Sequence, residues 1–197
     1  MSRPEFRSVI SVMLACLLTV SAGAAEKPEK KSAQTELDLY VTATEAWQML
    51  QENSDAVLVD VRDPVEIKFT GFATPTRIHV PWMLADLSGW SDKKSSWAMA
   101  KNPAFEQQLS DKLAALAVAK NAPIIIMCRS GSTRSAPAVN MLAAQGYSNV
   151  WTVVDGFEGT TLKQGDSKGV RAVNGWRNSG LPWSYKVDPA VAWQPSN

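Results

Sequence analysis

Histidine and cysteine are scarce in this sequence. Its 197 residues contain one histidine, His79, and two cysteines, Cys16 and Cys128. Zinc sites of the histidine and cysteine type need several such ligands at characteristic spacings. These three residues offer no such spacing, so we expect no metal site.

An excess of charge of either sign is also lacking. The chain has 20 lysine and arginine residues against 19 aspartate and glutamate residues, and its formal net charge is +1. Nucleic acids and anionic membrane surfaces attract proteins that carry a clear positive excess. We therefore expect no nucleic-acid partner and no role at a membrane surface.

A stretch that is apolar enough to span a membrane is lacking as well. The nearest candidate is at the N-terminus, where Arg3 and Arg7 precede an apolar stretch at residues 9–20 and a small-residue A-x-A site at residues 22–24. A spanning helix needs about 20 strongly apolar residues, and this stretch is shorter. The order of a positive start, a short apolar core and small residues is typical of a secretory signal peptide. We predict a cleaved signal over residues 1–25 and a periplasmic protein without stable membrane association.

Removal of the signal leaves a single cysteine. Cys16 lies within the apolar stretch and is lost with it, whereas Cys128 lies in the mature chain. A lone cysteine cannot form an internal disulfide, and in an oxidising compartment it indicates an intermolecular bond or a reactive thiol. We therefore expect Cys128 to carry chemistry.

The mature chain has the length of one domain. Residues 26–36 are polar and charged, which predicts a flexible tether. Residues 37–187 alternate between strand and helix patterns, and residues 188–197 form a C-terminal tail. Such alternation predicts an α/β fold with a central, mostly parallel sheet and helices on both faces.

The predicted elements follow from hydrophobic period and capping signals. A capping box at residues 42–45 begins the first helix, Asn102 caps another with Pro103 at its first position, and Gly146 closes the helix that begins near residue 136. Residues 82–101, which carry three tryptophans, are expected to be irregular. The predicted strands are Leu37–Val41, Ala56–Val61, Ile78–Pro81, Pro123–Met127 and Asn149–Val154.

Cys128 directly follows the strongest predicted strand, and residues 128–135 lead from it into a helix. Ligands of parallel α/β sheets bind beyond the carboxyl ends of the strands. Backbone N–H groups of such a loop and the N-terminus of the next helix can stabilise an anion. In such surroundings the pKa of a cysteine can fall from about 8.5 to roughly 3.5–7.5. With Arg129 and Arg134 to attract an anion, the thiolate could attack sulfur in a donor such as thiosulfate, or phosphorus or arsenic in an oxyanion.

The loop and several other segments resemble the rhodanese family. Residues 128–133 match the thiosulfate-type pattern C-R-x-G-x-[RT], and residues 60–66 resemble the early D-V-R-[ED]-P-x-E motif. Residues 146–150 resemble G-[FY]-x-N-V, and residues 176–182 resemble the closing W-x-x-x-G-[LY]-P. The resemblance covers roughly residues 37–185. Each motif is weak alone, but their shared order identifies the chain as similar to periplasmic single-domain sulfurtransferases.

The resemblance implies a persulfide mechanism on Cys128, with a thiosulfate-like anion as sulfur donor, a thiol or cyanide as acceptor, and no cofactor. It also implies that Asp60 and Arg62 form an ion pair that supports the site. Because Arg129 fits the gap-free pattern, we expect it to matter more for thiosulfate binding than Arg134. The residues expected to bind the substrate are Arg129, Ser130, Gly131, Ser132, Thr133 and Arg134.

Two departures from the family pattern keep alternatives open. If Arg134 is aligned with the family's usual R-S-A, the loop becomes C-x5-R, one residue longer, which is similar to rhodanese-fold relatives that act on phosphate or arsenate. Those relatives carry histidine where this chain has Met127. A phosphatase or arsenate reductase is therefore the main alternative, and a non-catalytic sulfur carrier is another. The second departure is a pair of insertions, at residues 82–101 and 159–174.

Overall fold

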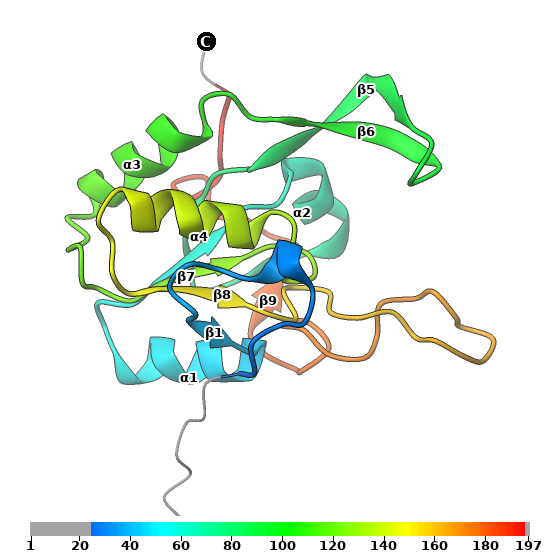
Figure 1. The fold of residues 1–197 in the computed structure, drawn as a ribbon, viewed down its shortest axis with the longest axis horizontal. Coiled ribbons are helices and arrows are strands. Elements are labelled where there is room, and N and C mark those ends of the chain that lie inside the picture. The colour runs from blue at the N-terminus through cyan, green and yellow to red at the C-terminus, as the bar shows by residue number, and fades with distance from the viewer. Residues whose placement is uncertain (1–24, 196–197) are drawn as a thin grey trace, which may run out of the picture.

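The computed structural model describes residues 25–195 as an α/β fold with a five-stranded, fully parallel sheet in the order β1-β8-β7-β2-β4 (Figure 1). The predicted α/β class is confirmed. The sheet strands are β1 (Tyr40–Val41), β2 (Val57–Asp60), β4 (Thr76–His79), β7 (Ile124–Met127) and β8 (Val150–Val153). The helices are α1 (Ala43–Glu52), α2 (Pro64–Thr70), α3 (Phe105–Ala115) and α4 (Ser135–Ala144), together with the 3-10 turn η1 (Lys31–Ala33).

Side chains of the central strands alternate between two hydrophobic cores. On β7, Ile124 and Ile126 pack into the core formed with α3 and α4, whereas Ile125 packs into the core formed with α1. Figure 1 shows α3 and α4 on one face of the sheet and α1 on the other. Strands covered on both faces are apolar throughout, which is why β2 and β7 read as continuous hydrophobic runs.

The first predicted helix begins where its capping signal placed it. The Thr42 hydroxyl accepts a hydrogen bond from the Glu45 N–H, and the Glu45 carboxylate accepts one from the Thr42 N–H. The predicted start of α3 was wrong. The helix begins at Phe105, and the Asn102 side chain instead closes the preceding turn by accepting a hydrogen bond from the Ala104 N–H and donating one to the Pro81 carbonyl.

Residues 82–101 are regular, contrary to the prediction. They contain an antiparallel hairpin of β5 (Met83–Ser91) and β6 (Ser96–Lys101), whose register shifts between Asp86 and Trp90. Most of its residues are half-buried or exposed, so the hairpin has no buried face. The alternation of apolar and polar residues that marks a half-buried strand is therefore absent from its sequence.

Residues 26–36, predicted to be a flexible tether, lie against the domain in this structure. The Thr35 N–H donates to the Tyr40 hydroxyl, and the Glu36 N–H donates to the Asn140 side-chain oxygen on α4. Ala33 is buried. Partners that lie elsewhere in the chain provide these contacts, so local composition could not reveal them.

The second insertion, residues 159–174, forms an extended arm. Within this arm, Thr161 and Arg171 pair as an antiparallel bridge. A separate two-stranded antiparallel sheet is formed by β3 (Phe72–Ala73) and β9 (Trp183–Ser184). In the view of Figure 1 this arm and the β5–β6 hairpin project from the same side of the domain.

Residues 1–24, on which the signal-peptide prediction rests, lie outside the described residues. Within residues 25–195, no helix is both long enough and apolar enough to cross a membrane.

Candidate active site

Parallel pairing brings the carboxyl ends of β2, β4, β7 and β8 to one edge of the sheet. Cys128 follows β7, Arg62 follows β2 and Asp155 follows β8. Asp155 ties neighbouring segments together, because its carboxylate accepts hydrogen bonds from the N–H groups of Ala43 and Gly175. This edge is the place where ligands of α/β sheets bind, as the sequence predicted for Cys128.

The Cys128 thiol is almost enclosed, with 2% of the residue exposed, and its Sγ lies 3.5 Å from the Ser135 hydroxyl at the start of α4. Burial is the largest single influence on the thiol and raises its pKa. The Arg134 cation, the Ser135 hydroxyl and the N–H groups of Ser130 and Ser135 outweigh burial and lower the pKa of Cys128 below its ordinary value. The surroundings therefore favour the thiolate, which is the nucleophilic form of cysteine.

The loop from Cys128 packs backbone against backbone on the segment that follows β8. The Phe157 N–H donates to the Cys128 carbonyl at 2.9 Å, and a Cβ on Gly156 would lie 2.5 Å from that same oxygen. Gly131 has φ +68°, and a Cβ there would lie 2.0 Å from the Val154 carbonyl. Both glycines are required by this close approach, and Gly131 also adopts a left-handed backbone conformation that favours glycine.

Arg134 links the loop to α2. Its guanidinium makes a two-bond ion pair with the Glu66 carboxylate, with Nη2 and Oε1 2.9 Å apart. Glu66 is the third residue of α2 and also accepts a hydrogen bond from the Asp63 N–H. Burial raises the pKa of Glu66, but the Arg134 partner and the Asp63 N–H leave it below its ordinary value. Arg134 is thus held as a cation beside the thiol.

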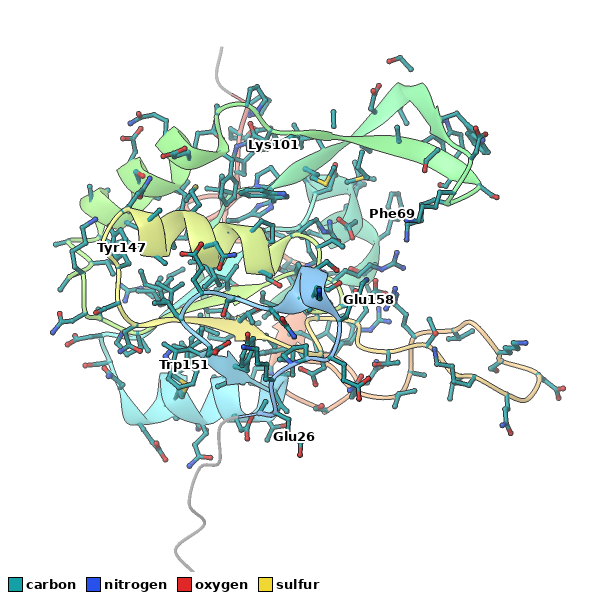
Figure 2. The ribbon with its side chains drawn as sticks, in the orientation of Figure 1. Glu26, Phe69, Lys101, Tyr147, Trp151 and Glu158 are labelled. Carbon is teal, nitrogen blue, oxygen red and sulfur yellow. The ribbon has the colours of Figure 1, made fainter. Side chains whose placement is uncertain are left out.

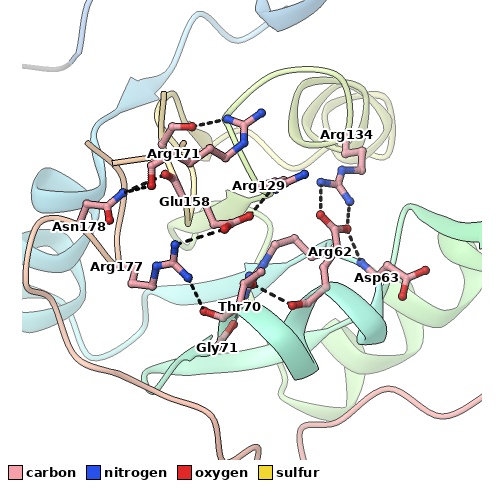
Figure 3. Close-up of polar contacts among 12 residues, drawn as sticks. Arg62, Asp63, Thr70, Gly71, Arg129, Arg134, Glu158, Arg171, Arg177 and Asn178 are labelled. Carbon is pink, nitrogen blue, oxygen red and sulfur yellow. Dashed lines mark hydrogen bonds and ion pairs between the residues drawn. The ribbon is translucent and has the colours of Figure 1, made fainter. Parts of the chain in front are cut away.

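Arg129 extends in another direction. Its Nε donates to the buried carboxylate of Glu158, which also pairs with Arg177 at 3.3 Å (Figure 3). The Arg129 side chain is 44% exposed, whereas that of Arg134 is 12% exposed. After burial, the Arg134 cation has the largest effect on the pKa of Cys128, which it lowers. The geometry therefore favours Arg134, rather than Arg129 as expected, as the arginine that serves the thiol.

Asp60 and Arg62 form the predicted ion pair, and both side chains are fully buried. The Arg62 guanidinium also donates to the Thr70 hydroxyl and the Gly71 carbonyl, both at 3.0 Å, and lies 3.9 Å from the centre of the Phe157 ring. Arg62 thereby attaches the end of α2 to the end of β2. Because α2 also carries Glu66, this attachment positions the partner of Arg134.

Two other predicted residues of the loop make contacts of a different kind. The Ser132 carbonyl accepts the Ala136 N–H within the first turn of α4. Thr133 is exposed and borders a cavity of about 280 Å³ that Ser32 and Gln34 share with it. Thr133 thus faces the N-terminal segment, and its expected role in binding the substrate finds no support in this geometry.

His79 is built into the core. Its Nε2 lies 2.9 Å from the Arg62 carbonyl, and its Nδ1 accepts the Trp193 N–H. Accepting that bond at Nδ1 places the ring proton on Nε2, which donates to Arg62. Burial lowers the pKa of His79, so the ring is neutral at neutral pH. Its two hydrogen bonds therefore give His79 a structural role.

Several residues of the site had no role in the sequence analysis. Ser135 contacts the thiol, Glu66 holds Arg134, and Glu158 holds Arg129 and Arg177. The sequence did contain a signal for Ser135, since backbone N–H groups at the start of a helix point toward an anion held by the preceding loop. No local signal existed for Glu158, because its partners come from distant segments. No cluster of three histidine, cysteine, aspartate or glutamate side chains suited to a metal ion occurs within residues 25–195.

Comparisons with known proteins agree with this fold. Residues 42–163 match the family model described as the Rhodanese-like domain. An uncharacterized protein of Rickettsia prowazekii is 30% identical over 148 residues, covering 74% of this chain and 96% of the relative. Thiosulfate sulfurtransferase GlpE of Actinobacillus succinogenes is 28% identical over 152 residues, covering 76% and 95%. The crystal structure of Rv0390 from M. tuberculosis superimposes with a TM-score of 0.57 at 30% identity, covering 75% of this chain and 97% of that one.

Proposed function

Because the chain belongs to the rhodanese-like domain family, we propose that it transfers sulfane sulfur from a thiosulfate-like donor to a thiol or cyanide through a persulfide on Cys128. One observation carries the proposal. The Cys128 thiol lies at the end of a parallel strand, where Arg134, Ser135 and two backbone N–H groups favour its anion. A near-buried thiolate of this kind is suited to attack a small electrophilic sulfur atom.

The transfer takes place in two balanced steps. The Cys128 thiolate attacks the outer sulfur of thiosulfate, a new S–S bond forms on the cysteine, and the S–S bond of thiosulfate breaks. Sulfite leaves with the electron pair of that bond. The persulfide anion then stays beside the N–H groups of Ser130 and Ser135 until a thiolate or cyanide attacks its terminal sulfur. This double displacement is covalent catalysis by an activated nucleophile, and it needs no cofactor.

Intact mass spectrometry tests the persulfide directly. Purified protein incubated with thiosulfate should gain the mass of one sulfur atom, and cyanide or a reducing thiol should remove it. The Cys128→Ser protein is the control, since the described chain has no other free cysteine. Absence of a reducible sulfur adduct on the parent protein, with thiosulfate in excess, would contradict the mechanism.

A second candidate function is hydrolysis or reduction of an oxyanion such as phosphate or arsenate. The observation that favours it is the Cys128-x5-Arg134 spacing together with the position of Arg134 beside the thiol. We favour sulfur transfer for two reasons. Met127 stands where the relatives that act on phosphate or arsenate carry histidine. The Arg134 guanidinium, which would bind an oxyanion in those relatives, is already bound to the Glu66 carboxylate. Thiosulfate:cyanide transfer should exceed aryl phosphate hydrolysis by at least about 100-fold in kcat/KM, or roughly 2.7 kcal/mol of transition-state preference. Comparable values of kcat/KM for sulfur transfer and for phosphate hydrolysis would instead support the oxyanion-directed function.

A sulfur carrier without turnover of its own is the third candidate. Repeated transfer from several donors separates it from an enzyme, because a carrier takes up one sulfur and waits for a partner protein.

We also propose that the protein acts in the periplasm, on the basis of the N-terminal pattern at residues 1–25. N-terminal sequencing of the exported protein should begin near Ala25 or Glu26, and recovery of the full-length chain in the membrane would contradict it.

A further inference from the structure

Two anions must meet in the proposed reaction, because both the Cys128 thiolate and thiosulfate are negative. Their repulsion has to be offset by nearby positive charge. Four guanidinium groups gather in this region, and Figure 3 shows them with the polar groups that they contact. They belong to Arg129, Arg134, Arg171 and Arg177, and two carboxylates, Glu66 and Glu158, face them.

Three of the four arginines are already paired. Arg134 binds Glu66, while Arg129 and Arg177 share Glu158. Arg171 differs, because no carboxylate within residues 25–195 forms an ion pair with it. Its guanidinium makes one hydrogen bond in the described chain, from Nη1 to the Gly159 carbonyl.

The backbone around Arg171 is anchored although the residue belongs to a projecting arm. Its carbonyl accepts a hydrogen bond from the Asn178 side chain, and it pairs with Thr161 in an isolated antiparallel bridge. The base of the arm is closed tightly, since a Cβ on Gly159 would lie 1.8 Å from the Asn174 carbonyl. A side chain attached to such a base can be held in place for binding.

The electrostatic environment agrees with this placement. Partial burial, followed by the Arg129 cation, lowers the pKa of Arg171 below its ordinary value, whereas the negative charges of Glu158 and then of Cys128 oppose that change. Arg171 is thus within electrostatic reach of the thiol and of the other cations. Because four arginines face two carboxylates, positive charge remains for an incoming anion, and Arg171 is the one of the four that pairs with no carboxylate of the described chain.

We propose that Arg171, from the inserted arm 159–174, binds the oxyanion end of the sulfur donor and makes the site selective for dianionic donors such as thiosulfate. The proposal rests on the proposed sulfurtransferase function. While Arg134 stabilises the attacking thiolate, Arg171 holds the group that departs as sulfite. The arm therefore acts as a specificity element, in addition to the Cys128–Arg134 loop that the sequence pattern indicates.

Two donors with the same outer sulfur make a sharp test. Thiosulfate carries two negative charges, whereas the methanethiosulfonate anion carries one and has a methyl group in place of one oxygen. In Arg171→Gln, KM for thiosulfate should rise by about tenfold, the order expected for loss of one charge-assisted hydrogen bond. KM for methanethiosulfonate should rise by less than about threefold, and kcat should change little, because the contact is made in both the ground state and the transition state.

The control is Lys168→Gln, which removes the same charge from an exposed position on the same arm. It should leave both KM values unchanged, and Arg171→Lys should recover part of the thiosulfate affinity. Equal changes for the two donors, or an equal effect of Lys168→Gln, would overturn the proposal.

Binding without turnover separates failure of this proposal from failure of the proposed function. In Cys128→Ser protein, calorimetric affinity for thiosulfate should fall about tenfold when Arg171→Gln is added. If it does so while the parent protein transfers no sulfur, Arg171 is an anion contact and the sulfurtransferase function is wrong. If sulfur is transferred but Arg171→Gln changes neither affinity nor KM, the role of Arg171 is wrong. Comparison of the melting temperatures excludes misfolding of the variant as a cause.

Discussion

The loop around Cys128 and the β5–β6 hairpin are built in opposite ways. The loop lies on buried strand ends, with two glycines that allow backbone contact and the buried Asp60–Arg62 ion pair beneath it. The hairpin exposes its largest side chains, since Trp90 and Trp97 are each 60% exposed and contact mainly one another, with ring centroids 6.2 Å apart. The comparison teaches that the chemistry of the protein depends on its enclosed parts. The hairpin, by contrast, relies on contacts made at the surface of the molecule.

The side chains of Figure 2 show the same contrast. Glu158 is buried and pairs with two arginines, whereas Phe69 on α2 is 71% exposed and lies toward the hairpin (Figure 2). A change at a buried and paired group leaves its partner without compensation, while a change at an exposed group alters mainly the surface. Four predictions, taken from the largest expected effect to the smallest, test whether the two regions differ in this way.

The largest effect is expected at the nucleophile. Cys128→Ser should abolish thiosulfate:cyanide transfer, because no other thiol of the described chain can hold the persulfide. Serine has a similar volume, so the far-ultraviolet circular dichroism spectrum and the melting temperature should match those of the parent. Transfer activity that survives this change would show that Cys128 is not the sulfur carrier.

The second effect concerns stability rather than chemistry. Asp60→Ala leaves the fully buried Arg62 cation without its carboxylate, and breaking a buried pair from one side costs about 3–5 kcal/mol. Urea unfolding monitored by tryptophan fluorescence measures the loss. Arg77→Met, at an exposed position on β4, is the control and should change the free energy of unfolding little. A loss no larger than that of the control would show that the pair does not support the site.

The third prediction compares the two arginines of the loop. Arg134→Ala should lower kcat/KM for thiosulfate by about tenfold to 100-fold, whereas Arg129→Ala should lower it by less than about tenfold, because a preorganised charge beside the reacting anion contributes most and the Arg134 cation lowers the pKa of Cys128. Removing the Arg134 cation raises the pKa of Cys128, so the pH at which single-turnover persulfide formation reaches half its maximum should move upward. Arg129→Ala should leave that midpoint in place. The reverse order would support the gap-free alignment of the loop.

The smallest effect is expected on the hairpin. Replacing Trp90 and Trp97 with serine removes a partly exposed ring pair and should change the free energy of unfolding by less than about 1.5 kcal/mol, the upper range for one aromatic pair. Transfer between thiosulfate and cyanide should stay within about twofold of the parent, because surface changes away from a site are usually small. A large loss with these small substrates would show that the hairpin supports the enclosed site after all.

Local sequence alone was enough for several features. The continuous apolar runs of β2 and β7 and the capping box at Thr42 predicted the parallel sheet and the first helix. The apolar run before Cys128 also predicted that this residue directly follows a buried strand of the parallel sheet. These features depend on neighbouring residues, and short-range spacing therefore carries the information.

The tertiary structure decided which groups meet. It placed Arg134 beside the thiol and Arg129 on Glu158, although the pattern favoured Arg129. It also brought Arg171 from an inserted arm toward the site. Such pairings join residues that are distant in the chain, and their energies depend on burial and on competing partners that no local pattern contains. The hairpin escaped prediction for a related reason, because a strand pair without a buried face leaves no alternation of apolar and polar residues in the sequence.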